Sequence, residues 1–337
     1  MDKDTIFVTF AEKIVPVFRV SIVMCTYNGE RYLARQLDSI LQQTYPLHEI
    51  LIQDDGSTDT TCDIVRRYQQ DHPFIRLIRN ERNLGFNRNF LSAISQASGD
   101  YVALSDQDDI WAPDKIASLL EVLQSSGKAA CFSRSRAFSD ETGEVDFFDP
   151  RTPNYSIERL ILANIVPGHT LLMKKSFTER LSLAAFEQID GWYYDEYIAV
   201  TAAACNQLDY CDKYLVSYRR HAAQITADME KAKPAAHPLR YVAKSIRLYF
   251  RKKKAITEGF RKKYDFLCSF PESNEHLDNA RQLTLLSSKR GLGSFFRLER
   301  LCVRRRRHIL ATAEMNPLAL FFKALFYPFY CANYFEE

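Results

Sequence analysis

Three carboxylates fall within four residues directly after the apolar run 101–104. They are Asp106, Asp108 and Asp109. Burying them without a cationic partner would be costly, so a cation is expected to meet them. The Asp-x-Asp spacing suits Mg²⁺ or Mn²⁺, which bind one or two carboxylates and complete their shells with water and phosphate oxygens. The segment predicts a metal that carries a phosphorylated ligand. The alternative is an acidic turn that caps the helix beginning near Pro113, and Asp109 is expected to do only that.

A second pair of carboxylates, Asp54 and Asp55, follows the short apolar run 50–52. A carboxylate at the end of a strand can accept hydrogen bonds from a nucleobase or a ribose. The alternative is that the pair caps the helix expected over 58–70. The loop 26–29 contains a single glycine, so the Gly-rich dinucleotide fingerprint is absent. That absence argues against a nicotinamide or flavin dehydrogenase.

Strands and helices are expected to alternate from residue 20 to residue 125. Apolar runs that predict strands lie at 20–25, 50–52, 75–78 and 101–104. Apolar residues at helical spacing separate them, which predicts an α/β fold with a parallel, doubly wound sheet. Parallel strands end at one edge of a sheet, so the loops that follow them should converge there. The residues gathered around that crevice are Thr26, Asn28, Asp54, Asp55, Asn83 and the carboxylates of 106–109.

Four segments in this order resemble family 2 glycosyltransferases, most closely the rhamnosyltransferase-like branch that builds bacterial surface polysaccharides. They are Val23–Gly29, Gln53–Asp59, Asn83–Gly85 and Leu104–Trp111. The resemblance is specific over 18–125, looser to about 225 and absent beyond. It implies a GT-A fold, which is a Rossmann-like mixed, mostly parallel sheet with helices on both faces. It also implies a nucleotide-sugar donor and inversion at the anomeric carbon.

The same resemblance implies roles for the residues around the crevice. The donor-binding residues would be Thr26, Tyr27, Asn28 and Glu30 on the nucleobase side, Asp54 and Asp55 at base and ribose, Asn83 and Arg88 at the nucleotide or diphosphate, and Asp106 at the ribose or sugar. Asp108 would bind the metal, Mg²⁺ or Mn²⁺. Arg88 is equally interpreted as a solvated helix arginine.

An inverting transfer also needs a general base beside the acceptor hydroxyl. In the family this base belongs to a pattern that often resembles His-Asp-x-Trp, and the chain has Tyr194-Asp195-Glu196-Tyr197. The resemblance assigns the base to Asp195, with Glu196 in reserve. Two departures, Tyr194 for His and Tyr197 for Trp, leave open that both acids only favour the start of a helix.

A later segment, Tyr218 to His221, resembles the family's Tyr-Arg-x-His pattern. By that resemblance Arg219 would neutralise phosphate, and His221 would complete the metal site or contact the diphosphate. The alternative for His221 is a structural histidine. The resemblance also places Gly168-His169-Thr170 near the acceptor, and Trp111 either below the sugar or in the core.

Charge divides the chain into two regions. Residues 238–308 contain 19 Lys and Arg against 6 Asp and Glu, a net of +13 that leaves −10 for the remainder. We therefore expect a GT-A domain over 18–235, with a nucleotide half at 18–125 and an acceptor half at 126–235. A basic helical C-terminal region would follow at 236–337.

The basic region predicts an anionic partner. It shows no nucleic-acid-binding module, so no nucleic acid is expected. Clusters at 251–254 and 304–307, beside the aromatic stretch 317–330, favour an anionic membrane surface. Lys323 and Pro328 interrupt that stretch, which is too short to span a bilayer. The alternative is a helical subdomain that packs on the catalytic body or on a second subunit.

Cysteine usage and the N-terminus predict a cytoplasmic protein. The eight cysteines are scattered without a Cys-x-x-Cys pair, so neither a zinc site nor a disulfide framework is expected. No basic start is followed by an apolar core, so no signal peptide is expected. Together with the basic region, these features predict a peripheral protein on the inner face of the cell membrane.

The combined prediction is a metal-dependent inverting glycosyltransferase of polysaccharide assembly, O-antigen or capsule. It would move rhamnose or another hexose from a dTDP- or UDP-linked donor to a saccharide or lipid-linked acceptor. One alternative is a sugar-1-phosphate nucleotidyltransferase, which would need a Gly-rich basic loop that 26–30 lacks. The other is a non-catalytic scaffold that binds nucleotide sugars.

Overall fold

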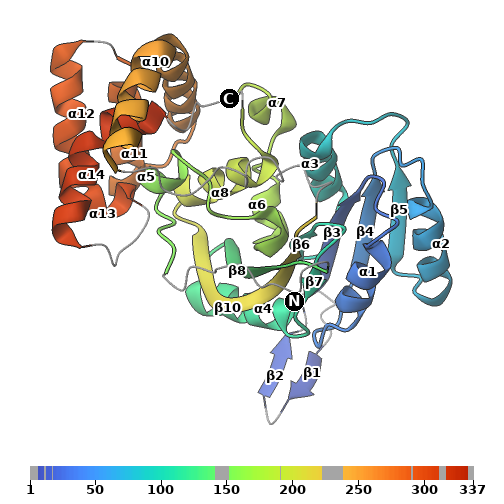
Figure 1. Cartoon of the computed structure of the whole chain (residues 1–337). Coiled ribbons are helices and arrows are strands. Elements are labelled where there is room, and N and C mark those ends of the chain that lie inside the picture. The colour runs from blue at the N-terminus through green and yellow to red at the C-terminus, as the bar shows by residue number, and fades with distance from the viewer. Residues whose placement is uncertain are drawn as a thin grey trace. The chain divides into compact units, whose positions relative to one another are not determined.

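In the computed structural model the chain forms two compact units (Figure 1). The residues that the structure describes are 7–10, 13–16, 18–140, 152–189, 191–221, 238–289, 291–310 and 316–332. The first unit comprises 1–146, 167–183 and 209–219, and the second comprises 147–166, 184–208 and 220–337. The units do not follow the single boundary expected near residue 235, because two segments before it group with the C-terminal helices.

A mixed sheet of eight strands forms the core of the first unit, in the order β5-β4-β3-β6-β9-β8-β10-β7. The strands are β3 (Val20–Thr26), β4 (Glu49–Asp54), β5 (Ile75–Arg79), β6 (Tyr101–Ser105), β7 (Ile110–Trp111), β8 (Ala130–Phe138), β9 (Leu171–Lys174) and β10 (Leu208–Arg219). The first four pair in parallel, as the sequence predicts. Strand β9 runs antiparallel to β6 and β8, and β7 runs antiparallel to β10.

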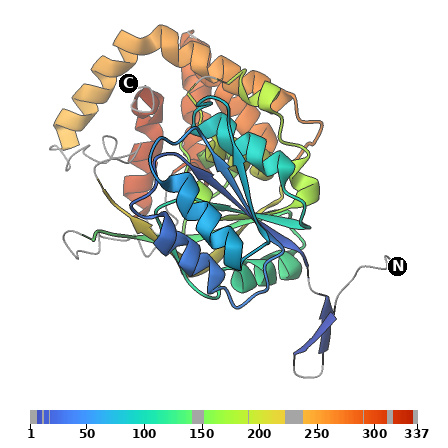
Figure 2. The same cartoon turned by 90° about the vertical axis from the view of Figure 1, so that its right-hand side faces the viewer.

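Helices cover both faces of this sheet (Figure 2). They are α1 (Leu33–Leu41), α2 (Thr61–Asp71), α3 (Phe86–Gln96) and α4 (Lys115–Ser126). Val20, Ile22 and Met24 of β3 share one apolar core with α1, α2 and α4, whereas α3 packs on β3 and β4 from the other side. All seven residues of β3 are buried because both of its faces are covered.

Smaller elements complete the first unit. A separate antiparallel pair, β1 (Phe7–Phe10) and β2 (Lys13–Pro16), was not expected from the sequence. A short 3-10 helix, η1 (Gly168–Thr170), precedes β9, and α6 (Lys175–Thr178) follows it. Helix α7 (Leu183–Phe186) lies where the chain passes from the first unit to the second.

The described part of the second unit is helical, which confirms the predicted helical C-terminal region. Its helices are α5 (Ile157–Leu160), α8 (Tyr194–Ala204), α10 (Pro238–Cys268), α11 (Glu275–Ser287), α12 (Leu292–Arg304), α13 (Arg306–Ile309) and α14 (Pro317–Tyr330). Within the described residues, no helix combines the length and the apolar character needed to cross a bilayer.

Arg305 fastens three helices of the second unit together. Its guanidinium donates to the buried carboxylate of Glu158 at 2.6 Å and to Glu275 at 2.6 Å. The imidazole of His276 lies 3.1 Å from the Glu158 carboxylate. Arg305 belongs to the arginine cluster predicted to meet anionic lipid, but its side chain is only 11% exposed and is used inside the unit.

A buried carboxylate, Glu49, ties the start of β4 to three other segments. It accepts hydrogen bonds from Ser21 Oγ at 2.6 Å, from the backbone N–H and hydroxyl of Ser98, and from the Arg76 guanidinium at 2.7 Å. Burial opposes the ionisation of Glu49, but these donors outweigh it and lower its pKa to about 2. The ionised form therefore stabilises the folded state at neutral pH.

Replacing Glu49 by Gln should lower the free energy of unfolding at pH 7 by on the order of 2–3 kcal/mol. A carboxyl with a depressed pKa stabilises the fold above its unfolded pKa, so the difference from wild type should shrink as the pH falls from about 4.5 toward 2. Chemical denaturation across this pH range measures it. Glu121→Gln, at an exposed position of α4, should stay near wild type. A Glu49→Gln deficit independent of pH would contradict the assignment.

Candidate functional site

The carboxyl ends of β3, β4 and β6 meet at one edge of the sheet, where the sequence predicts a crevice. Thr26 lies opposite Asp54 in the register, and Met24 lies opposite Ser105. Asp54 is fully buried, and its carboxylate accepts hydrogen bonds from Thr26 Oγ1 at 3.0 Å, from the Ser57 N–H at 2.9 Å and from the Ser57 hydroxyl. Asp54 therefore closes the loop after β4.

Asp55 holds the next loop along the edge. Its carboxylate accepts from the N–H groups of Leu84 and Gly85, at 2.8 and 2.9 Å, and from Asn80 Nδ2 at 2.7 Å. Asn83 Nδ2 donates to the Asp55 carbonyl at 3.1 Å. Gly85 has φ +80°, a backbone conformation that favours glycine, and α3 begins directly after it. The prediction that Asp54 and Asp55 contact base and ribose stays a prediction, because the structure shows both carboxylates engaged within the loops.

Asn28 and Glu30 join the loop after β3 to the loop after β4. Asn28 Oδ1 accepts from the Thr58 N–H at 2.9 Å, and the Asn28 N–H donates to Ser57 Oγ at 2.9 Å. Glu30 Oε2 accepts from the N–H of Thr60 at 3.0 Å and from its hydroxyl at 2.7 Å. These hydrogen bonds fix the loop on the predicted nucleobase side.

Gln107, the middle residue of Asp-x-Asp, binds the acidic loop to the loop after β3. Its side-chain amide accepts from the Tyr27 N–H at 3.0 Å and donates to the Tyr27 carbonyl at 3.1 Å. A Cβ atom at Gly29 would lie 2.2 Å from Gln107 Oε1, so a glycine makes room for this pair. The Tyr27 ring itself is 49% exposed. Sequence reasoning treated Gln107 as a spacer, because no local pattern signals such a bridge.

His169 reaches the acidic loop from η1. Its Nδ1 lies 3.1 Å from Asp106 Oδ2 and 3.5 Å from Asp109 Oδ2. Asp109 is fully buried, and burial raises its pKa while His169 opposes that rise. Burial also works against protonation of His169, but the two carboxylates outweigh it and raise the pKa of the imidazole. The carboxylates of Asp106 and Asp109 thus favour the protonated form of His169.

The contact of His169 with Asp106 and the buried position of Asp109 were not expected from the sequence. The resemblance placed His169 near the acceptor, whereas within the first unit it contacts Asp106. Asp109 does not cap α4, since that helix begins at Lys115 with Asp114 at its N-cap and Asp109 lies buried in the loop. The penalty for burying Asp109 is offset by partners that are distant in sequence.

Lys115 adds a second buried basic side chain to this region. Its ammonium donates to the His169 carbonyl at 2.6 Å and lies 3.1 Å from the centre of the Trp111 ring. Burial lowers the pKa of Lys115, with Asp109 and Asp106 opposing. Trp111 is itself 3% exposed, which agrees with its interpretation as a core aromatic residue.

Arg219 clamps the acidic loop from β10. Its Nε donates to the Asp108 carbonyl at 2.7 Å, and its backbone N–H donates to Asp109 Oδ1 at 3.0 Å. The guanidinium also pairs with Asp140 and lies 4.6 Å from the ring centres of both Tyr32 and Phe138. Arg219 is 1% exposed, so the structure places it as a support of the loop. Its predicted contact with phosphate stays a prediction.

The remaining predicted residues lie on α3 of the first unit or in the second unit. Arg88 is exposed on α3. Asp195 is half-buried in the first turn of α8, and His221 belongs to the second unit. Glu196 is 12% exposed and lies 3.8 Å from the Lys263 ammonium. Burial raises the pKa of Glu196 to about 7, although Lys263 opposes the rise.

A divalent metal is compatible with the donors at the sheet edge. Ligand atoms of Asp106, Asp109 and His169 lie within 4.8 Å of one another. Asp109 Oδ2 and His169 Nε2 are buried and accept or donate no hydrogen bond within the described residues. Asp106 and Asp108 are half-buried, so their carboxylates suit a hard cation at the mouth of the loop.

Arg219→Lys should lower the free energy of unfolding by about 2 kcal/mol, because a lysine cannot reproduce both the Nε bond and the guanidinium pair. Thermal or urea unfolding measures this change. Arg35→Lys is the matched control, since Arg35 pairs with the same Asp140 at 3.3 Å but is 66% exposed. Its loss should cost about 0–1 kcal/mol. Equal effects of the two substitutions would contradict a clamping function for Arg219.

Comparison with known proteins identifies relatives of parts of this chain. An uncharacterized glycosyltransferase of Nostoc sp. is 37% identical over 108 residues, which is 32% of this chain and 34% of that protein. The putative teichuronic acid biosynthesis glycosyltransferase TuaG of Bacillus subtilis is 27% identical over 49% of this chain and 65% of its own length. The chain thus spans less than two thirds of either curated relative.

The fold has solved counterparts as well. The crystal structure of S. aureus TarS 1–349 in complex with UDP-GlcNAc superposes with a TM-score of 0.57 at 16% identity, covering 87% of this chain and 82% of that one. This likeness concerns the fold, which is GT-A as predicted. Residues 21–181 match the family model described as Glycosyl transferase family 2. Over these residues the chain is therefore similar to glycosyl transferase family 2.

Proposed function

We propose that this protein is a glycosyltransferase that moves a sugar from a nucleotide-sugar donor to an acceptor hydroxyl during polysaccharide assembly. The observation that carries the proposal is the set of interlocked loops at the carboxyl ends of β3, β4 and β6, within the residues similar to family 2. Open α/β sheets bind ligands at this edge. The similarity to a putative teichuronic acid biosynthesis glycosyltransferase supports a polysaccharide product.

The donor would bind across the interlocked loops. Tyr27, half exposed, offers a ring face to the nucleobase beside Asn28. Asn83 and Arg88 stand at the loop and helix where the diphosphate would pass. Asp54 and Asp55 hold these loops in place, because their carboxylates accept hydrogen bonds from backbone N–H groups of the loops. Preformed loops of this kind avoid the entropy of ordering on binding.

Asp106 and Asp108 would hold Mg²⁺ or Mn²⁺. Carboxylates suit these hard cations better than imidazole does. His169 is therefore not proposed as a ligand, and its Nδ1 already pairs with Asp106 and Asp109. A bound cation would neutralise the charge that develops on the departing nucleoside diphosphate. Arg219 and Gln107 would keep the two carboxylates in place through their bonds to the same loop. The predicted pairing of Asp108 with His221 remains a prediction.

Asp195 would act as the general base. It lies at the start of α8, where the helix dipole favours a carboxylate. It would accept the proton of the acceptor hydroxyl as the oxygen attacks the anomeric carbon opposite the leaving diphosphate, which inverts the configuration. Glu196 is less suited, because it is held in a nearly buried pair with Lys263.

The finer features of the donor, acceptor and location are also proposals. We retain rhamnose or another hexose on dTDP or UDP, and a saccharide or lipid-linked acceptor. The net charge of +13 over 238–308 supports peripheral attachment to an anionic membrane surface on its cytoplasmic face.

Asp108→Asn should reduce sugar transfer by at least about 100-fold, because the substitution removes a carboxylate at the proposed metal. A panel of nucleotide sugars with Mn²⁺ and an extracted acceptor pool, monitored by release of nucleoside diphosphate, measures it. Asp63→Asn, at an exposed ion pair on α2, should keep full activity. A non-catalytic scaffold would release no diphosphate even as wild type.

Asp195→Asn should lower kcat by about 100- to 10,000-fold and leave donor affinity unchanged, since a general base acts on the acceptor. Glu196→Gln should instead lower stability, because it leaves the Lys263 ammonium buried without its carboxylate. Single-turnover kinetics and donor titration calorimetry separate the two effects. Loss of transfer in a stable Glu196→Gln variant, with Asp195→Asn active, would reverse the assignment.

A further inference from the structure

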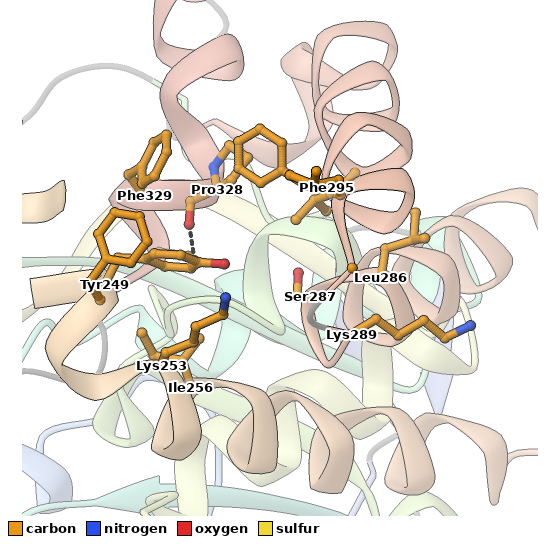
Figure 3. A pocket seen from close by; sticks show the side chains of 14 residues that line it. Tyr249, Lys253, Ile256, Leu286, Ser287, Lys289, Phe295, Pro328 and Phe329 are labelled. Carbon is orange, nitrogen blue, oxygen red and sulfur yellow. Dashed lines mark hydrogen bonds between the residues drawn. The ribbon is translucent and has the colours of Figure 1, made fainter.

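The second unit contains a pocket remote in sequence from every residue assigned above. It lies among α10, the end of α11, the start of α12 and the end of α14, and its volume is about 210 Å³ (Figure 3). Aromatic rings form much of its wall. The Phe329 ring lies 5.4 Å from the Tyr249 ring and 5.6 Å from the Phe295 ring, measured between centroids. α10 is kinked at Lys252, within the stretch that lines the pocket.

Polar groups face this largely apolar space, among them the hydroxyl of Tyr249 (Figure 3). The Ser287 side chain is aimed into the pocket, and so is the ammonium of Lys253 (Figure 3). Ser287 is only 8% exposed, yet its hydroxyl has no hydrogen-bond partner within the described residues. An unsatisfied buried hydroxyl is costly, so it indicates a missing partner. No aspartate or glutamate lines the pocket. A hydroxyl donor and an ammonium together suit an anionic oxygen.

The rim of the pocket is apolar and exposed. Phe250 and Leu292 line the pocket and are 64% and 78% exposed, and Phe296 on α12 is 62% exposed. Exposed apolar residues next to an opening indicate contact with another apolar phase. The surrounding region carries the basic excess of the chain, +13 over residues 238–308. Charge complementarity therefore favours an occupant that is both apolar and anionic.

We propose that this pocket binds an anionic phospholipid of the membrane surface. One acyl chain would enter among the aromatic rings, and the phosphate would accept hydrogen bonds from Lys253 and Ser287. The volume of about 210 Å³ is adequate for a short length of acyl chain, since an apolar protein cavity of about 150 Å³ already holds the six carbons of benzene. The inference deepens the proposed membrane attachment and rests on that part of the proposed function only. Lipid binding in this pocket requires neither a donor sugar nor catalysis.

The test uses the full chain and dihexanoyl phosphatidylglycerol, kept monomeric below its micelle concentration, in titration calorimetry. We expect saturable binding of one lipid per chain. Lys253→Ala should weaken this binding about tenfold or more, the effect of losing a charge-assisted hydrogen bond. Lys254→Ala removes the same charge from the neighbouring exposed position and should change the affinity by less than about twofold.

Ser287→Leu fills the pocket and removes the unsatisfied hydroxyl, so the variant should stay folded and lose lipid binding. If it does not fold, the Lys253 and Lys254 pair decides alone. Absence of saturable binding to wild type, or equal weakening by both lysine substitutions, would overturn the proposal and indicate attraction by net charge. The outcome is independent of sugar transfer, because a chain active on its donor can fail this titration and an inactive one can pass it.

Discussion

The candidate site depends on two carboxylates that are buried where a strand ends. Asp54 and Asp55 are 0% and 3% exposed, and their oxygens accept hydrogen bonds from N–H groups of two successive loops. A carboxylate buried without such donors would be strongly destabilising. These hydrogen bonds therefore constrain both loops. This is the condition for binding a nucleotide without a further ordering cost.

The acidic loop next to them is held by three basic side chains from other parts of the first unit. His169 from η1 faces Asp106 and Asp109, Lys115 from α4 holds the His169 carbonyl, and Arg219 from β10 holds the backbone of the loop. These contacts compensate the buried Asp109 and leave Asp106 and Asp108 half-buried. The arrangement places acceptor oxygens where a cation can reach them and supports the loop from beneath. Electrostatic stabilisation of a leaving group requires charged and polar groups that are already held in position.

Much of the first unit could be predicted from the sequence. The apolar runs at 20–25 and 101–104 became parallel strands, and the residues after them converged on one edge, because strand order and direction follow from the alternation of strands and helices. Periodicity carries no information on pairing between distant segments. It therefore missed the Gln107 bridge, the contact of His169 with Asp106 and the clamp of Arg219 on the acidic loop.

The same reason explains the differences in the basic region. A count of charges treats all four arginines at 304–307 alike. Arg305, however, forms ion pairs with Glu158 and Glu275 inside the second unit. The pocket beside Lys253 likewise depends on helices that only the fold brings together.

The most direct measurement of the donor site is X-ray diffraction from crystals of the full chain grown with Mn²⁺ and either UDP or dTDP. We expect an anomalous Mn²⁺ peak in contact with Asp106 or Asp108, a diphosphate on that metal and a nucleobase beside Tyr27. A nucleotide bound away from the carboxyl ends of β3, β4 and β6, or a metal peak remote from the 106–109 loop, would contradict this assignment.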